Sequence, residues 1–129
     1  MLPVDEPFRT ESLRIRDDLE DGKIGVLTPD LLLYEIGNRL RLERDLIDRE
    51  KRQVIDILWM LPFFLIPLRK KLIRQTLTIA QRHQITFYDA LFVSAAYSAR
   101  TTLYTADEKL LQKVASLSYV RHLKDYTIA

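Results

Sequence analysis

The 129-residue sequence contains no cysteine. This absence excludes a disulfide scaffold, a thiolate zinc site and a cysteine nucleophile, and it fits a reducing cytoplasm. Glycine is scarce as well, with three residues, so few positions can require a positive φ angle and we expect a helix-rich chain with short loops. Pro62 and Pro67 interrupt the longest apolar run, 57–68. That run is too short for a membrane span, which needs about 20 apolar residues.

The sequence also lacks a strong excess of charge of one sign. Twenty Lys and Arg against 18 Asp and Glu give a net charge of +2, which does not indicate a protein that binds polyanions with its whole surface. Met1–Asp5 has neither a charged start nor an apolar stretch, so we expect no signal peptide. The 47% hydrophobic content excludes wholesale disorder. We therefore expect one cytoplasmic domain, residues 1–129, without a membrane association.

Short apolar runs separate longer stretches with helical spacing. Helical spacing is found in 8–19, 29–44, 48–60, 69–83, 88–99 and 106–115. Strands are predicted at 24–27, 101–104 and 119–123, and 63–66 is predicted to be extended or a loop. Thr28 and Pro29 are predicted to be the N-cap and the first residue of the second helix. Strands that alternate with helices indicate an α/β fold with a parallel sheet.

Two carboxylates lie at or near helix starts or apolar faces. Glu35 lies inside the predicted helix 29–44, at the edge of an apolar stripe, where an exposed ion pair with Arg39 is an equally simple interpretation. Asp89 begins the apolar helix 88–99, and its spacing from Thr86 is that of a capping box. Each position alone is therefore compatible with a purely structural role.

A third carboxylate, Asp107, follows the predicted strand 101–104. Thr105 and Glu108 have capping-box spacing around it, but a position just past the carboxyl end of a parallel strand is also where open α/β sheets bind ligands. Together, Glu35, Asp89 and Asp107 would supply the hard oxygen ligands that Mg²⁺ or Mn²⁺ prefers. The spacing alone does not show that the three meet in space.

Three segments around these acids resemble a known family. They read TPDLLLYEIGN at 28–38, ITFYDALFV at 85–93 and LYTADEKLL at 103–111, and their order and spacing are similar to those of PIN-domain proteins, close to the VapC-type toxin ribonucleases. The resemblance covers nearly the whole chain. It implies a three-layer α/β/α fold, a Mg²⁺- or Mn²⁺-dependent endoribonuclease that hydrolyses RNA, and a type II toxin–antitoxin setting with a cognate antitoxin and a homodimer.

The resemblance also implies roles for individual residues. Glu35, Asp89 and Asp107 would be the catalytic and metal-binding acids, and Thr105 and Asn38 would be polar neighbours of the site. The family opens with a central strand that ends in an Asp, the first acid of the site. Met1–Pro7 resembles the loop after that strand, and Asp5 does not match the acid.

We therefore expect the family's first strand and its Asp to be absent from this sequence, with the true start upstream. Loss of a central parallel strand would leave its neighbours unpaired. The alternative is an N-terminally truncated, non-catalytic protein that binds RNA or an antitoxin.

Positive charge gathers in three groups along the chain. They are Arg39, Arg41 and Arg44; Arg49, Lys51 and Arg52; and Arg69, Lys70, Lys71 and Arg74. A track for an RNA backbone and a solvated helix face both fit, and acidic residues dilute the middle group. Arg39, Lys70 and Lys71 are the candidate RNA contacts.

A dense apolar cluster lies in the middle of the chain. It consists of Trp59, Met60, Phe63, Phe64 and Ile66. The cluster fits either the core of the domain or an exposed face for a twin subunit or an antitoxin. His83 and His122 are far from the acids in sequence and receive no role.

Overall fold

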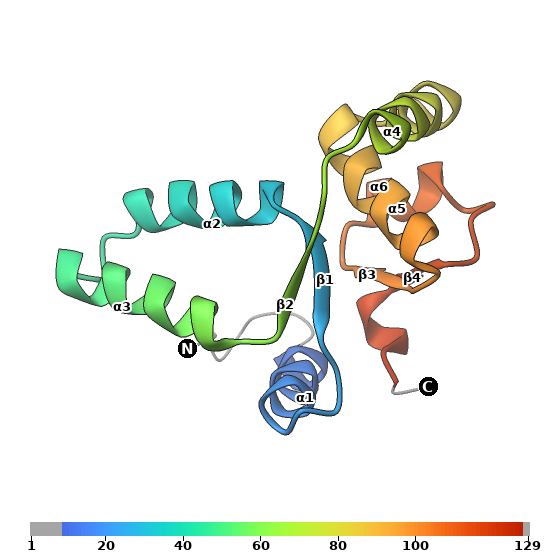
Figure 1. Cartoon of the computed structure of the whole chain (residues 1–129). Helices are drawn as coiled ribbons and strands as arrows, with labels where there is room; N and C mark the ends of the chain where they lie inside the picture. The colour runs from blue at the N-terminus through green and yellow to red at the C-terminus, as the bar shows by residue number, and fades with distance from the viewer. Residues whose placement is uncertain (1–8, 128–129) are drawn as a thin grey trace.

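The computed structural model describes residues 9–127, so Met1–Phe8, including Asp5, and residues 128–129 lie outside the described part. Strands alternate with helices, as predicted, and the fold is α/β (Figure 1). The elements are α1 (Arg9–Glu20), β1 (Val26–Pro29), α2 (Leu31–Leu42), α3 (Asp48–Met60), β2 (Phe63–Ile66), α4 (Lys70–His83), α5 (Phe87–Ala99), β3 (Leu103–Thr105), α6 (Glu108–Lys113), β4 (Val120–His122) and the 3₁₀ turn η1 (Leu123–Asp125).

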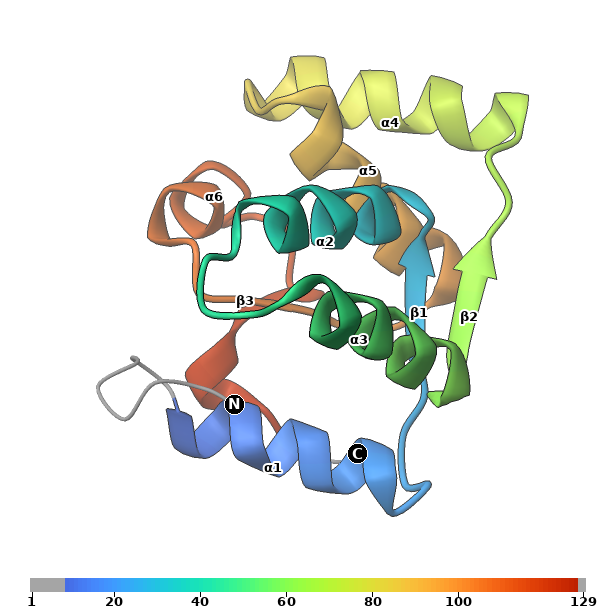
Figure 2. The ribbon, with the colours of Figure 1, turned by 90° about the vertical axis from the view of Figure 1, so that its left-hand side faces the viewer.

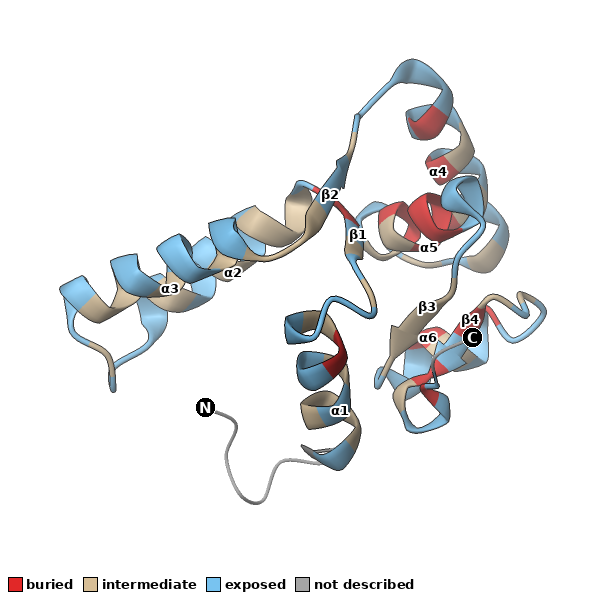
Figure 3. Cartoon of the chain, turned by 60° about the horizontal axis from the view of Figure 1, so that its bottom comes forward, coloured by how far each residue is buried: buried red, intermediate tan, exposed pale blue. Residues whose placement is uncertain are grey.

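The strands form two small parallel sheets. β1 pairs with β2, with Val26 opposite Phe63, and β3 pairs with β4, with Leu103 opposite Val120. The strands are parallel as predicted, but no ladder joins β1 to β3 within residues 9–127. Across the molecule β1 and β3 are nevertheless the inner strands, with β2 and β4 on the outside (Figures 1 and 3).

Helices lie on both sides of the strands. α5 contacts both β1 and β3, and α4 packs antiparallel along α5. Gln75 of α4 donates hydrogen bonds to the hydroxyls of Ser94, at 2.6 Å, and Ser98, at 3.0 Å. α2 and α3 lie on the opposite side of β1 and β2 from α5 (Figure 2). The arrangement is thus layered, with strands between helices.

The core is concentrated in the C-terminal half of the chain. Its buried cluster consists of Val93 of α5, Leu110 of α6, Val114 at the C-cap of α6, and Val120 of β4. Each fully buried apolar side chain of this size contributes about 1.5–3 kcal/mol to stability. By contrast, α2 and α3 contain no buried residue and project away from the strands as an antiparallel pair, the α2–α3 arm (Figure 3).

A buried hydrogen bond ties α1 to the C-terminal end of the described chain. Tyr126 Oη donates to Asp18 Oδ2 at 2.8 Å, and both residues are 7% exposed. Burial and the Asp18 carboxylate raise the pKa of Tyr126 to about 12. The Tyr104 ring packs edge-on against Tyr126, with ring centroids 5.2 Å apart, so β3 contributes to the same contact.

The start of α2 differs from the prediction. Thr28 is not an N-cap; it lies in β1, 3% exposed, and its Oγ1 donates to the Pro29 carbonyl at 2.9 Å. Pro29 is the last residue of β1, and α2 begins after Asp30. The physical reason is pairing, because Pro29 lies opposite Ile66 of β2 and this tertiary contact outweighs the local capping signal. Between residues 9 and 127, no helix is long and apolar enough to cross a membrane.

Candidate functional site

The three predicted acids lie on three different helices: Glu35 within α2, Asp89 in α5 and Asp107 at the start of α6. Glu35 is exposed on α2, which follows β1, and Asp89 is half-buried in the first turn of α5. Asp107 is exposed at the N-cap of α6, directly after β3. Their positions along the elements agree with the sequence analysis.

The carboxylates of Glu35 and Asp89 have no partner among the described side chains. The predicted ion pair between Glu35 and Arg39 is not formed; within residues 9–127 the ion pairs are Arg16–Asp17 and His122–Glu108. Thr86 does cap α5 as predicted, because its Oγ1 accepts the Asp89 N–H at 3.0 Å. This cap uses the backbone of Asp89 and leaves its carboxylate available.

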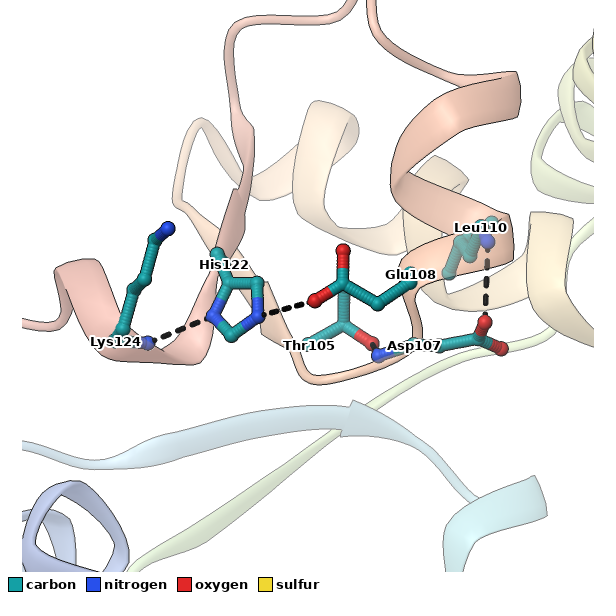
Figure 4. A network of polar contacts seen from close by, with 6 residues as sticks. All are labelled: Thr105, Asp107, Glu108, Leu110, His122 and Lys124. Carbon is teal, nitrogen blue, oxygen red and sulfur yellow. Dashed lines mark hydrogen bonds and ion pairs between the residues drawn. The ribbon is translucent and has the colours of Figure 1, made fainter. Parts of the chain in front are cut away.

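Asp107 has a structural role of its own. Its Oδ1 accepts the Leu110 N–H at 3.1 Å and caps α6, so the predicted capping box with Thr105 as N-cap is wrong. Thr105 Oγ1 instead accepts the Asp107 N–H at 3.0 Å, and Glu108 contacts His122 rather than the backbone (Figure 4). Since one hydrogen bond occupies Oδ1, Oδ2 is the oxygen of Asp107 without a hydrogen bond in the described chain.

The cap can be separated from the charge of Asp107 by two substitutions. Asp107→Ala removes the acceptor for the Leu110 N–H and is expected to lower the free energy of unfolding by about 0.5–2 kcal/mol. Asp107→Asn keeps an acceptor of nearly equal capping strength and is expected to unfold close to the wild-type midpoint. Urea denaturation of both variants measures the difference; equal loss in both would contradict the observed cap.

The structure does not gather the acids into a complete metal site. No group of three or more His, Asp or Glu side chains in residues 9–127 is placed to hold a metal ion. Glu35 follows β1 and Asp107 follows β3, two strands of different sheets, so no ladder fixes their separation. The oxygen donors suit Mg²⁺ or Mn²⁺, but their arrangement alone does not form the site.

The residues predicted to lie beside the acids differ in what they contact. Thr105 Oγ1 accepts the Asp107 N–H, whereas Asn38 Oδ1 accepts from Arg41 Nε at 3.3 Å. Lys70 and Lys71 are exposed in the first turn of α4 and, with Arg74, line a hollow of about 430 Å³. Sequence reasoning missed the Glu108–His122 pair, because the two residues are brought together by the pairing of β3 with β4.

The interpretation of the apolar cluster as core is wrong for three of its members. Trp59 is 72% exposed, Met60 84% and Phe64 60%. A hollow of about 190 Å³ lies beside them, between the arm and β2. Its lining is apolar: Leu33, Leu58, Trp59, Leu61, Phe63 and Leu65. An exposed apolar surface of this kind is typical of a partner interface.

Comparison with known proteins gives matches over most of the chain. The family model of the PIN domain matches residues 2–117. Ribonuclease VapC1 of Mycobacterium tuberculosis strain CDC 1551 / Oshkosh is 35% identical over 85 residues, which are 64% of this chain and 62% of that protein. Ribonuclease VapC1 of strain ATCC 25618 / H37Rv matches with the same values. The chain thus spans 62% of the length of these relatives. No solved structure matches it.

Proposed function

This chain belongs to the PIN domain family, and from that premise we propose that it is a metal-dependent endoribonuclease, the toxin of a type II toxin–antitoxin system. It would act in the cytoplasm as one domain, residues 1–129. The similarity to Ribonuclease VapC1 supports this proposal. The observation that carries it is that Glu35, Asp89 and Asp107 each keep at least one carboxylate oxygen without a hydrogen bond in the described chain.

Mg²⁺ or Mn²⁺ is the proposed cofactor, because the candidate ligands are all carboxylate oxygens. Glu35, Asp89 and Asp107 would hold the ion. Such an ion, when bound, would supply charge neutralisation of a phosphodiester and activation of water. Thr105 holds the backbone of Asp107 in place, and the helix cap orients the Asp107 carboxylate.

The division of the strands supports a further part of the proposal. The resemblance to the family implies a central strand that ends in an acid. If that strand is missing, the strands on either side of it are left unpaired. β1 and β3 are the inner strands, and no ladder joins them in residues 9–127. We propose that the family's first strand is not part of the described chain, and that a strand between β1 and β3 would complete the sheet.

RNA is the proposed substrate, with Arg39, Lys70 and Lys71 as contacts to its backbone. Replacing Lys70 and Lys71 together with Ala is expected to make RNA binding less salt-dependent. For single-stranded RNA, loss of two phosphate contacts lowers the slope of log affinity against log salt by about 1.4. The measurement is a binding titration at several salt concentrations. The matched control is the Arg49→Ala/Arg52→Ala double variant, for which we expect the wild-type slope. An unchanged slope in the Lys70/Lys71 variant would show that these two residues do not contact the RNA backbone.

A cognate antitoxin and a second copy of the chain are the proposed protein partners. The exposed apolar side chains of Trp59, Met60 and Phe64 on the arm and β2 support a protein interface there. The absence of buried residues in α2 and α3 supports it further, because a helix pair of this kind gains stability when a partner covers it.

The deciding experiment is RNA cleavage by the full chain with Mn²⁺, with and without EDTA. Cleavage that EDTA abolishes is the expected result for a metal-dependent ribonuclease. The second candidate function is a non-catalytic PIN-domain protein that binds RNA or an antitoxin. It is favoured by the lack of a gathered metal-binding group in residues 9–127. A folded wild-type chain that binds RNA but cuts nothing would select that function.

A further inference from the structure

Basic residues are concentrated in the middle of the chain. Residues 61–106, which run from the end of α3 to just before α6, contain six Lys and Arg and one acid, Asp89. The rest of the chain contains 14 Lys and Arg against 17 Asp and Glu. The small net charge of +2 therefore combines a strongly basic segment with a weakly acidic remainder, and we expect only the basic segment to attract a polyanion.

Two hollows of this basic segment adjoin each other along α4 and α5. The first has a volume of about 520 Å³, and its charged lining residues are Arg69, Lys71 and Arg100. The second has a volume of about 380 Å³ and is lined by Arg82 and His83. Gln75 and Tyr97 line both hollows, so the two form one surface, the α4–α5 groove. No Asp or Glu of residues 9–127 lines the groove.

The cations of the groove have no acidic partner. The ion pairs of residues 9–127 are Arg16–Asp17 and His122–Glu108, and both lie outside the groove. Arg69 and Lys71 come from the start of α4, whereas Arg100 follows the last turn of α5. The fold therefore brings three unpaired positive charges into one hollow from two helices, and this charge is complementary to the phosphates of a nucleic acid.

An exposed aromatic ring lies between the two hollows. Tyr97 is 59% exposed although it lies on α5, the helix that carries most of the buried residues. Its ring packs against that of Tyr119, with ring centroids 5.7 Å apart, and Tyr119 is half-buried. A ring that is supported on one side and open on the other is a surface on which an unpaired base can stack.

The walls of the groove are held together by a polar link. Gln75 of α4 uses its amide group to donate to the hydroxyls of Ser94 and Ser98, and Ser94 is fully buried. This link fixes α4 against α5, so the groove is part of the folded structure. Since Ser98 Oγ accepts from Gln75, the hydroxyl proton of Ser98 is available to a phosphate oxygen in the first hollow.

We infer that the α4–α5 groove binds single-stranded RNA, with Arg69, Lys71 and Arg100 on the phosphates and the ring of Tyr97 stacked on a base. A basic groove with exposed aromatic rings is typical of proteins that bind single strands, and stacking of this kind requires unpaired bases. The inference rests on the proposed function for the choice of RNA. It places the RNA on the side of β1 and β2 away from the α2–α3 arm (Figure 1).

Tyr97→Ala tests the stacking contact in the full chain. Fluorescence anisotropy with a labelled oligouridylate measures Kd, in EDTA so that no metal-dependent cleavage occurs. We expect Kd to rise about 10-fold in Tyr97→Ala and to stay near the wild-type value in Tyr97→Phe, which keeps the ring. Tyr34→Ala is the matched control, because Tyr34 of the α2–α3 arm is 68% exposed. A thermal melt shows that each variant is folded at the temperature of the titration.

The Arg69→Gln/Arg100→Gln double variant tests the phosphate contacts. Gln keeps much of the side chain and removes the charge. We expect the slope of log affinity against log salt to fall by about 1.4, the effect of losing two phosphate contacts with a single strand. Arg49→Gln/Arg52→Gln is the matched control, for which we expect the wild-type slope.

The outcomes separate the groove from the proposed function. A wild-type Kd in Tyr97→Ala, or a wild-type slope in the Arg69/Arg100 variant, overturns the inference, and so does a wild type that binds no RNA. If the variant with a wild-type slope also changes its elution volume in size-exclusion chromatography, the groove is a contact between copies of the chain. A wild type that shows both expected effects but cuts nothing with Mn²⁺ overturns the proposed ribonuclease and supports the groove.

Discussion

Asp89→Asn is expected to reduce Mn²⁺-dependent RNA cleavage by at least about 100-fold, the upper end of the effect of losing an outer partner of a metal ligand. The substitution removes a negative charge and keeps the size of the side chain. It also keeps the backbone N–H that Thr86 accepts, so the start of α5 is preserved and the folded fraction should not change. Cleavage of a single-stranded RNA under saturating Mn²⁺ measures the effect.

Thr86→Ala is the matched control for this variant. It removes the cap of α5 and costs about 1 kcal/mol of stability, but it leaves the Asp89 carboxylate in place. We expect Thr86→Ala to retain cleavage below its unfolding temperature. If instead both variants lose activity in proportion to their loss of stability, Asp89 acts through the helix start and not as a ligand.

Tyr126→Phe is expected to lower the free energy of unfolding by about 1–3 kcal/mol, because it leaves the buried Asp18 carboxylate without its donor. Both residues are 7% exposed, so water does not readily replace the hydroxyl. Tyr119→Phe is the matched control: its hydroxyl forms no hydrogen bond within residues 9–127, and its ring packs against Tyr97. We expect less than about 0.5 kcal/mol there. Urea denaturation at neutral pH measures the free energy of unfolding of both variants. Equal losses in the two variants would mean that the hydrogen bond to Asp18 is not the cause.

The same hydrogen bond predicts a dependence of stability on alkaline pH. The pKa of Tyr126 rises from an ordinary value of 10.0 to about 12 in the folded protein. Its contribution to stability is therefore fully present below pH 10 and is lost between pH 10 and pH 12. Over this range the wild type should lose more stability than Tyr126→Phe, and the two unfolding curves should converge. A constant difference between them would contradict the assignment.

Local structure was predictable where a local signal was sufficient. Helical spacing and Pro62 mark α3 at 48–60, and the structure has α3 at Asp48–Met60. The Thr86 cap was predicted correctly for the same reason, since a cap involves residues three apart. In these segments the local preference and the tertiary structure agree.

Long-range pairing was not predictable from the same signals. The pattern at 63–66 fitted a strand or a loop, because its strand character depends on β1, far away in the sequence. Pairing with Ile66 also placed Pro29 in a strand instead of a helix. The contact of His122 with Glu108 arises from the register of β3 and β4. The three acids were chosen from the sequence, but their relative positions depend on how two separate sheets are held together.

The division into two sheets has a consequence for cooperativity. Backbone ladders transmit unfolding from strand to strand, but no ladder crosses from β1 to β3 in residues 9–127. We therefore expect the sheet of β1 and β2 to unfold together with the α2–α3 arm, whose helices bury no residue. The buried cluster around Val93 and Val114 would stay folded. The described chain would then behave as two units of unequal stability that share α5, with the less stable unit carrying Glu35 and the more stable one carrying Asp107.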